Sequence, residues 1–201
     1  MSPPFFRIER FDGLCVVRLQ SADGTNRLTR ECVLALTTAI RELAQATEPL
    51  IITGNSKFFS AGADLNEIVA LTGPAAYEFS QLGQALMDLI ERFPTPVLAA
   101  IHGYCLGGGL DLALACHHRI ASPHAVFGHR GAALGLITGW GGTQRLPRLI
   151  GKAKAMEMFV TAEKIRAAEA LRIGLVELVA ADPVQHAAKL LAKADFWLHS
   201  Q

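Results

Sequence analysis

The stretch from residue 96 to residue 115 restricts the fold more than any other part of this 201-residue chain. Residues 96–102 are almost continuously apolar, which is typical of a strand that is covered on both faces of a sheet. A glycine-rich run follows at residues 103–109, and then an apolar segment at residues 110–115, which we predict to be a helix. A buried strand that turns through glycines directly into a buried helix is typical of an α/β fold.

The same order of strand, small-residue turn and helix occurs earlier, at residues 51–69. The first N–H groups of a helix have no partner within the helix and attract anionic oxygen. Glycine and alanine let a ligand approach the backbone closely. Two such turns facing each other would offer two N–H donors to one carbonyl oxygen, an oxyanion hole worth about 3 kcal/mol per donor. Glycine turns also serve close packing alone, so the residues by themselves leave both interpretations open.

Hydrophobic periodicity and turn residues predict strands and helices that alternate along the rest of the chain. No linker, charge run or repeat divides the sequence, so we predict one α/β domain over residues 1–201. The expected strands lie at residues 6–9, 15–19, 50–53, 119–121, 125–127 and 175–179, and the expected helices at residues 29–43, 65–69, 75–92, 143–150, 152–161, 167–173 and 183–193.

Composition and charge exclude several classes of function. The net charge is +1, which gives no electrostatic basis for binding nucleic acid or a membrane surface. No apolar run is long enough for a signal peptide or a membrane span, and the cysteines at positions 15, 32, 105 and 116 form no Cys-x-x-Cys pair. We therefore expect a cytoplasmic protein with buried thiols. Cys116, His117 and His118 lack companion ligands at metal spacing, so no metal site is expected.

Several segments resemble, in their order along the chain, the signatures of the enoyl-CoA hydratase/isomerase (crotonase) family. They are Phe-Ser-Ala-Gly-Ala-Asp-Leu at 59–65, Ala-Ala-Ile-His-Gly-Tyr-Cys-Leu-Gly-Gly-Gly at 99–109, Phe-Gly at 127–128, Gly-Gly-Thr-Gln-Arg-Leu-Pro-Arg at 141–148 and Gly-Leu-Val at 174–176. The resemblance implies a crotonase-like spiral of ββα units, C-terminally shortened because family members usually continue for several tens of residues. It also implies a homotrimer or a hexamer.

The resemblance implies an acyl-CoA substrate, with coenzyme A as part of that substrate and no separate cofactor. The backbone N–H groups of Ala63 and Gly108 match the oxyanion hole of the family. The segment from residue 60 to residue 65 would lie near the adenine and pantetheine of CoA. The implied substrate-binding residues are Ser60, Ala61, Gly62, Asp64, Leu65, Gly107, Gly131 and Trp140.

The chain departs from the family at its acid/base positions. The two glutamates of a family hydratase fall here at Asp111 and Gly131. Hydration needs one group to take a proton from water and one to deliver a proton to carbon, whereas a lone carboxylate could move a proton between two carbons. We expect isomerisation or an atypical hydration, with Asp111 as the acid/base. The alternative is a catalytically impaired acyl-CoA-binding or assembly protein, in which Asp111 only contacts backbone N–H groups at the helix start.

Other polar residues have structural interpretations. Asp64 and Glu67 have the spacing of a capping box. We expect His129 to be an exposed loop histidine, although it lies two residues before Gly131. Arg145 follows a glycine turn and could meet a phosphate, but a solvated helix face is the ordinary expectation.

Overall fold

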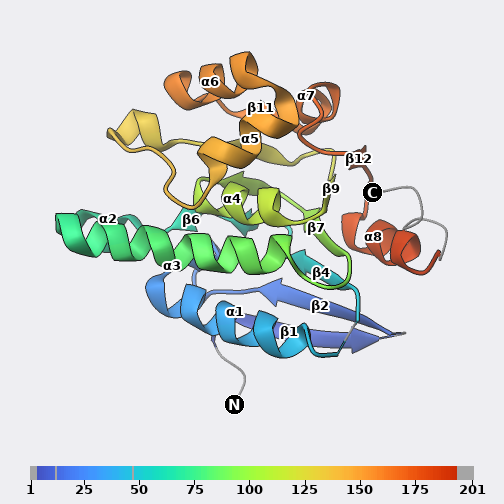
Figure 1. Cartoon of the computed structure of the whole chain (residues 1–201). Coiled ribbons are helices and arrows are strands. Elements are labelled where there is room, and N and C mark those ends of the chain that lie inside the picture. The colour runs from blue at the N-terminus through green and yellow to red at the C-terminus, as the bar shows by residue number, and fades with distance from the viewer. Residues whose placement is uncertain (1–3, 12, 47, 194–201) are drawn as a thin grey trace.

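The computed structural model describes residues 4–11, 13–46 and 48–193. Its largest sheet has six strands, in the spatial order β1, β2, β4, β7, β9 and β12 (Figure 1). The first two strands form an antiparallel hairpin and the other neighbours are parallel. The bounds are β1 (Phe6–Phe11), β2 (Leu14–Leu19), β4 (Leu50–Thr53), β7 (Val97–Ile101), β9 (His118–Ala121) and β12 (Leu178–Val179).

Shorter strands form a second, four-stranded sheet and a two-stranded pair. Each parallel strand of the large sheet, from β4 to β9, is followed by a strand of the second sheet and then by a helix. This succession is the spiral of ββα units that the resemblance implies. The second sheet has the order β11 (Ile165–Arg166), β10 (Val126–Gly128), β8 (Tyr104–Leu106) and β5 (Phe58–Ser60), and the pair consists of β3 (Arg27–Leu28) and β6 (Gly62–Ala63).

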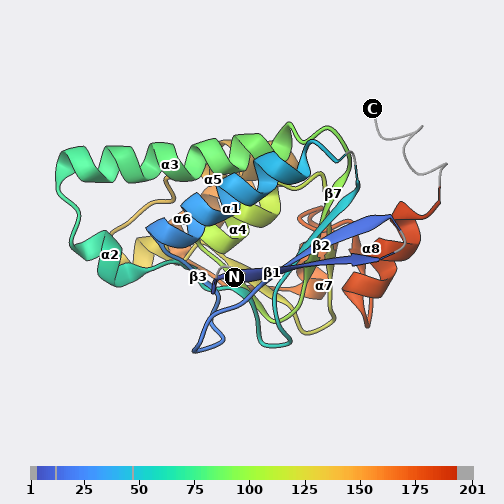
Figure 2. The same ribbon diagram turned by 90° about the horizontal axis from the view of Figure 1, so that it is seen from below.

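Helices cover both faces of the six-stranded sheet, and α1 and α3 run side by side on one of them (Figures 1 and 2). Alternate residues of β7 enter different cores. Val97 and Ala99 belong to the core under α1, α3 and α4, whereas Leu98 packs in the smaller core against α8. This explains why residues 97–101 are apolar throughout. The helices are α1 (Arg30–Leu43), α2 (Leu65–Val69), α3 (Gly73–Glu91), α4 (Gly108–Ala115), α5 (Gly142–Ile150), α6 (Lys152–Thr161), α7 (Ala167–Arg172) and α8 (Pro183–Leu191).

Local side-chain caps begin several helices, as the sequence predicts. Thr29 Oγ1 accepts a hydrogen bond from Cys32 N at 3.1 Å at the start of α1. Asp64 Oδ1 accepts from Asn66 N at 2.8 Å and so caps α2. Glu67 does not complete a capping box with Asp64. Its carboxylate accepts instead from Arg30 N at 2.8 Å, and thereby ties α2 to the first turn of α1.

The shortest strands escape sequence analysis. We predicted a turn at residues 103–109, but Tyr104–Leu106 forms β8, and β5 and β6 likewise lie within the predicted turn before α2. Runs of two or three residues carry no detectable periodicity, and their hydrogen-bond partners lie far away in the sequence. The predicted strand at residues 175–179 shortens to β12, because Leu175 N and Val176 N bond to Ala170 O at the end of α7.

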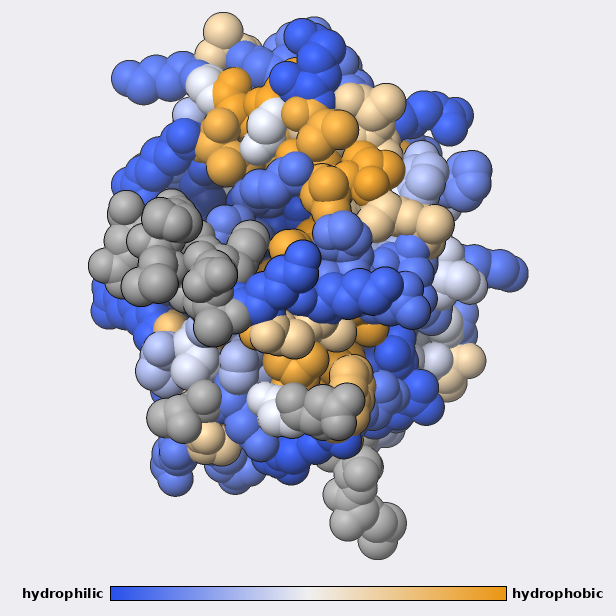
Figure 3. Space-filling view, turned by 90° about the vertical axis from the view of Figure 1, so that its right-hand side faces the viewer, coloured by the Kyte–Doolittle hydropathy of each residue, from blue (hydrophilic) through white to orange (hydrophobic). Residues whose placement is uncertain are grey.

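The surface that carries α8 has two separate apolar areas divided by hydrophilic residues (Figure 3). No continuous apolar patch therefore covers this face among the residues that the structure describes. Within the same described residues, no helix has the length and apolar character needed to cross a bilayer.

Arg119 in β9 is a buried cation that joins the sheet to the segment before β12. The residue is 4% exposed, its Nε donates to Leu175 O at 3.0 Å and its Nη1 donates to Cys116 O at 2.8 Å. Its Nη2 donates to the carboxylate of Glu177.

We expect Arg119→Met to lower the free energy of unfolding by about 2–3 kcal/mol, measured by urea titration, because the three acceptors of the guanidinium group lose their donors. Arg172→Ala, which removes an exposed ion pair with Glu169, should have a much smaller effect on stability, and equal losses would contradict this role of Arg119.

Candidate active site

The two glycine turns face each other. Gly62 has a φ of +91°, and a Cβ atom placed on it would lie 2.6 Å from Leu106 O and 2.8 Å from Gly108 N. A Cβ atom on Gly108 would lie 3.3 Å from Ala63 N. The backbone of β6 therefore packs directly against the start of α4, and the N–H groups of Ala63 and Gly108 belong to adjacent pieces of chain. As the first residue of α4, Gly108 has no intrahelical acceptor for its N–H.

Ser60 holds the first turn from the interior of the protein. Its hydroxyl group donates to Asn26 O at 2.7 Å and accepts from Gly62 N at 3.0 Å. The side chain is completely buried, and Gly109 of α4 packs so closely that a Cβ atom there would lie 2.7 Å from Ser60 Cβ. Ser60 thus fixes the conformation of Gly62 and the approach of the two turns.

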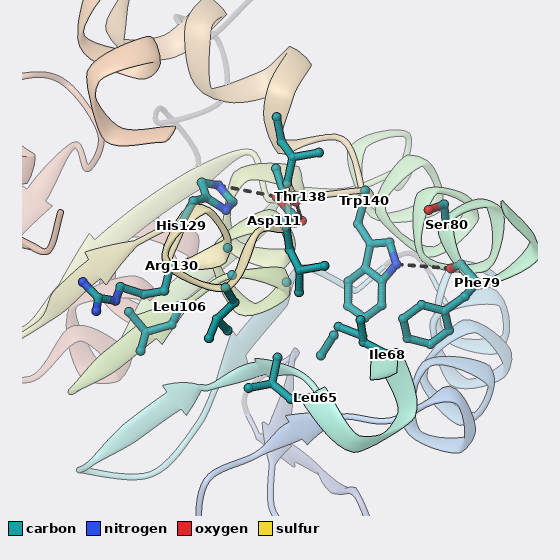
Figure 4. Close-up of a pocket in the computed structure, with 18 of the residues that line it drawn as sticks. Leu65, Ile68, Phe79, Ser80, Leu106, Asp111, His129, Arg130, Thr138 and Trp140 are labelled. Carbon is teal, nitrogen blue, oxygen red and sulfur yellow. Dashed lines mark hydrogen bonds and ion pairs between the residues drawn. The ribbon is translucent and has the colours of Figure 1, made fainter. Parts of the chain in front are cut away.

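A cavity of about 420 Å³ opens beside the two turns, between α2, α3, the start of α4 and the loop that precedes α5 (Figure 4). Most of its wall is apolar, and the ionisable side chains among its described lining residues are Asp111, His129 and Arg130. Such a cavity suits an apolar group that carries a reactive polar centre. Of the residues predicted from sequence, those in the wall are Ala61, Ala63, Leu65, Gly107, Gly108, Asp111, Gly131 and Trp140, while Ser60, Gly62 and Asp64 lie outside it.

Trp140 is buried in the core and also lines the cavity. Its indole Nε1 donates a hydrogen bond to the backbone oxygen of Phe79 at 3.2 Å (Figure 4). The centroids of the Trp140 and Phe79 rings lie 5.3 Å apart. Gly83 on α3 and Gly108 on α4 leave the space for the indole, because a Cβ atom at either glycine would collide with the ring. The ring thus forms a fixed wall of the cavity between these helices.

Asp111 is a buried carboxyl group in the first turn of α4. It is 1% exposed, and Thr138 Oγ1 donates a hydrogen bond to its Oδ2. Burial raises its pKa to about 7, against the opposing effects of the Thr138 hydroxyl, the Arg145 charge and the N–H groups of Trp140 and Gly142. Burial therefore outweighs these opposing hydrogen bonds and charges in setting the pKa of Asp111. Asp111 does not cap α4, whose N-cap is Gly107.

The expectation that His129 is exposed is wrong. The side chain is 3% exposed, its Nε2 lies 3.6 Å from Asp111 Oδ1, and its ring packs on Phe159 with a centroid distance of 5.2 Å. Burial lowers its pKa to about 4, so the imidazole is neutral at pH 7. Residue 129 directly follows β10, and this strand carries it into the interior. The strand was predictable, but the helix that covers its end is distant in sequence.

Residue 131, which matches the position of the second glutamate of family hydratases, is a glycine, and the neighbouring backbone fills the space that a side chain would need. A Cβ atom on Gly131 would lie 2.7 Å from Leu136 O. Leu136 N donates to Gly131 O at 2.9 Å, and this bond folds the chain back after a short 3₁₀ helix at Gly131–Leu134. In this conformation the loop leaves no space for a side chain at residue 131.

Arg145 is neither solvated nor placed to meet a phosphate. Its guanidinium group donates to Asp88 Oδ1 at 2.7 Å and to Glu91 Oε2 at 2.6 Å, and these bonds link α5 to α3. Its positive charge still lowers the pKa of Asp111. Among the described parts of the chain, no group of three or more His, Cys, Asp or Glu side chains could hold a metal ion.

The ββα spiral with two facing glycine turns and a buried carboxyl group defines a crotonase-like α/β protein. A sequence profile of the family described as enoyl-CoA hydratase/isomerase matches residues 9–199. The chain belongs to this family. It is 49% identical over 146 residues to a probable enoyl-CoA hydratase of Bacillus subtilis, covering 72% of this chain and 57% of that protein. It is 42% identical over 175 residues to a crotonyl-CoA hydratase of Syntrophomonas wolfei, covering 86% of this chain and 67% of that protein.

Solved structures agree with this assignment. Pseudomonas aeruginosa DspI superimposes with a TM-score of 0.90 at 34% identity, covering 96% of this chain and 75% of that one. An enoyl-CoA hydratase from Bacillus anthracis gives a TM-score of 0.88 at 34% identity, covering 93% of this chain and 75% of that one. The predicted fold is therefore confirmed. The chain spans a little over half the length of the Bacillus subtilis relative.

Proposed function

We propose that this protein binds an enoyl-CoA or a related acyl-CoA and transfers a proton at the α- or γ-carbon of the acyl chain. The N–H groups of Ala63 and Gly108 hold the thioester oxygen, and Asp111 is the acid/base. The observation that carries this proposal is the buried Asp111 carboxyl group in the wall of the cavity, beside Gly108 and with a pKa of about 7. The names of the two hydratase relatives support the substrate class.

The chemistry follows from where charge develops. Removing the γ-proton of a 2-enoyl thioester, or the α-proton of its 3-enoyl isomer, gives the same dienolate, whose negative charge gathers on the thioester oxygen. Two fixed N–H donors stabilise that oxygen more strongly than they stabilise the uncharged thioester, and so lower the barrier. A carboxyl group with a pKa of about 7 is partly ionised near neutral pH, so Asp111 can both accept and return a proton.

Isomerisation fits this site better than ordinary hydration. Asp111 is the one carboxyl group among the described residues that line the cavity, and the loop at Gly131 leaves no space for a second. One carboxyl group can carry a proton from one carbon to another. Hydration in the manner of a two-glutamate enzyme requires a further group to activate water.

A second candidate function is acyl-CoA binding or assembly without turnover. The closed loop at Gly131 favours it, because a chain that no longer handles water has no need of space for a second acid there. The two functions make different demands on Asp111. A binding protein needs only the cavity and the oxyanion turns, whereas an enzyme needs the ionisable carboxyl group.

We also propose that copies of the chain associate as a homotrimer or hexamer. Apolar side chains stand exposed around the cavity and on α2, among them Val69 at 86% and Ile137 at 71% exposure. Contacts between copies would remove such side chains from water. Light scattering after size-exclusion chromatography would test this proposal, and a monomer at micromolar concentration would contradict it.

The proposed reaction can be tested with crotonyl-CoA in deuterated buffer, followed by mass spectrometry. We expect deuterium to enter the α- or γ-carbon faster than in buffer alone, with little formation of the 3-hydroxyacyl product. Efficient hydration would contradict the preference for isomerisation. Binding of crotonyl-CoA without exchange or hydration would contradict the enzyme and support the binding protein.

A further inference from the structure

Three buried polar atoms at the base of the cavity have no hydrogen-bond partner among the described residues. They are Asp111 Oδ1 and the two ring nitrogens of His129. Two of them, Asp111 Oδ1 and His129 Nε2, lie 3.6 Å apart and are joined by a dashed line in Figure 4. Buried polar groups are almost always paired, so an unpaired donor and acceptor at this distance point to a function.

The surroundings hold these two groups toward each other. Thr138 already donates to the other carboxyl oxygen, Oδ2. The ring of His129 packs on Phe159, which confines it from the side of α6. Gly142 at the start of α5 leaves the space between the two side chains open, because a Cβ atom there would collide with Asp111 Oδ1 and lie 2.9 Å from His129 Nε2.

The other charged and ionisable groups nearby do not compete for His129. Arg145 on α5 influences Asp111 but is bound to Asp88 and Glu91 on α3. Cys105 on β8 is neutral, because burial raises its pKa well above the ordinary value. Arg130 lines the cavity but donates to Ala162 O at 2.6 Å.

We propose that His129 is a positioning residue for Asp111, and that its neutral imidazole donates the Nε2–H to Asp111 Oδ1 when the carboxyl group ionises. This inference rests on the proposed function, in which Asp111 is the acid/base. Closing the gap from 3.6 Å to the usual 2.9–3.0 Å requires a movement of about 0.6 Å. Each carboxylate oxygen then accepts a side-chain hydrogen bond, Oδ2 from Thr138 and Oδ1 from His129, in addition to the effect of the backbone N–H groups of Trp140 and Gly142.

The neutral state of the imidazole matters for this role. A histidinium would form an ion pair and hold Asp111 ionised, which would prevent it from returning a proton. Burial keeps His129 neutral at pH 7, with a pKa of about 4, so it stabilises the carboxylate by a hydrogen bond alone. The expected consequence is a pKa of Asp111 that stays near neutrality and does not rise further.

The test is a nuclear magnetic resonance titration of Asp111 Cγ in the free protein, with His129→Gln and His129→Met as a matched pair. The two replacement side chains have similar size, but only glutamine can donate a hydrogen bond. We expect His129→Met to raise the pKa of Asp111 by about one unit and His129→Gln to leave it within about 0.3 units of the wild type. Equal effects of the two changes, or no effect of either, would overturn the inference.

A measurement on the unmodified protein keeps the inference testable if a variant does not fold. The ¹⁵N shifts of the His129 ring report which nitrogen carries the proton, and we expect the Nε2–H form above pH 8. The Nδ1–H form would overturn the inference. Neither readout requires turnover. If the titration supports His129 and no exchange into crotonyl-CoA occurs, the proposed function fails while the contact between His129 and Asp111 stands.

Discussion

Asp111→Asn is expected to slow proton exchange at the α- or γ-carbon of crotonyl-CoA by about a thousandfold. Asparagine keeps the shape of the side chain and can still accept from Thr138, but it cannot take up or return a proton. General acid–base groups contribute about 10²–10⁴ in rate, and Asp111 is the single carboxyl group in the described cavity wall. The measurement is deuterium incorporation per active site, compared between the variant and the wild type at equal occupancy by the thioester.

The same change should also alter how stability depends on pH. In the folded protein the pKa of Asp111 is about 7, whereas its ordinary value is 3.8, so the folded state binds this proton more tightly than the unfolded state. The free energy of unfolding therefore falls as pH rises between these two values, and Asp111 contributes little further change above about pH 8. Between pH 5 and pH 8 the wild type should lose about 2–3 kcal/mol that Asp111→Asn does not lose.

Urea unfolding of both proteins at pH 5 and pH 8 measures this difference directly. Comparing the two proteins cancels the contributions of other ionisable groups. Parallel loss of stability would show that Asp111 ionises normally and would remove the basis for its role as acid/base. Exchange that survives in Asp111→Asn would assign the proton transfer to another group.

Gly62→Ala is expected to disrupt the site through its backbone. The φ of +91° is unfavourable for an L-residue, and the new Cβ atom would lie 2.6 Å from Leu106 O and 2.8 Å from Gly108 N. Backbone strain and overpacking together should lower the free energy of unfolding by about 3–5 kcal/mol. Separation of the two turns should lower kcat/KM at least about a hundredfold, the usual cost of losing one oxyanion donor.

Gly73→Ala provides the matched control. Gly73 begins α3, and a Cβ atom there would have no neighbour within 4 Å. This change should leave stability within about 1 kcal/mol of the wild type and leave exchange unchanged. Thermal unfolding and binding of crotonyl-CoA separate a misfolded Gly62→Ala from a folded protein with displaced donors. A stable, fully active Gly62→Ala would refute the close meeting of the two turns.

Most of the elements of the fold could be predicted from local sequence. The alternating strands, the cap of α1 by Thr29 and the two strand–turn–helix units depend on residues that are neighbours in the chain. The turns of residues 58–64 and 103–109 could not be divided into their short strands. Those strands exist only through pairing, such as that of Arg27–Leu28 with Gly62–Ala63.

The sequence by itself determined the class of the protein and pointed to Asp111 as the proposed acid/base, because ordered motifs and the Asp111 and Gly131 positions are local features. Only the tertiary structure decided that Asp111 is buried with a pKa of about 7, that His129 lies beside it, and that the loop at Gly131 is closed. The physical reason is that burial and pairing depend on elements far apart in the chain. Asp111, Thr138 and His129 come from different elements, and their shared environment forms only when these elements pack together.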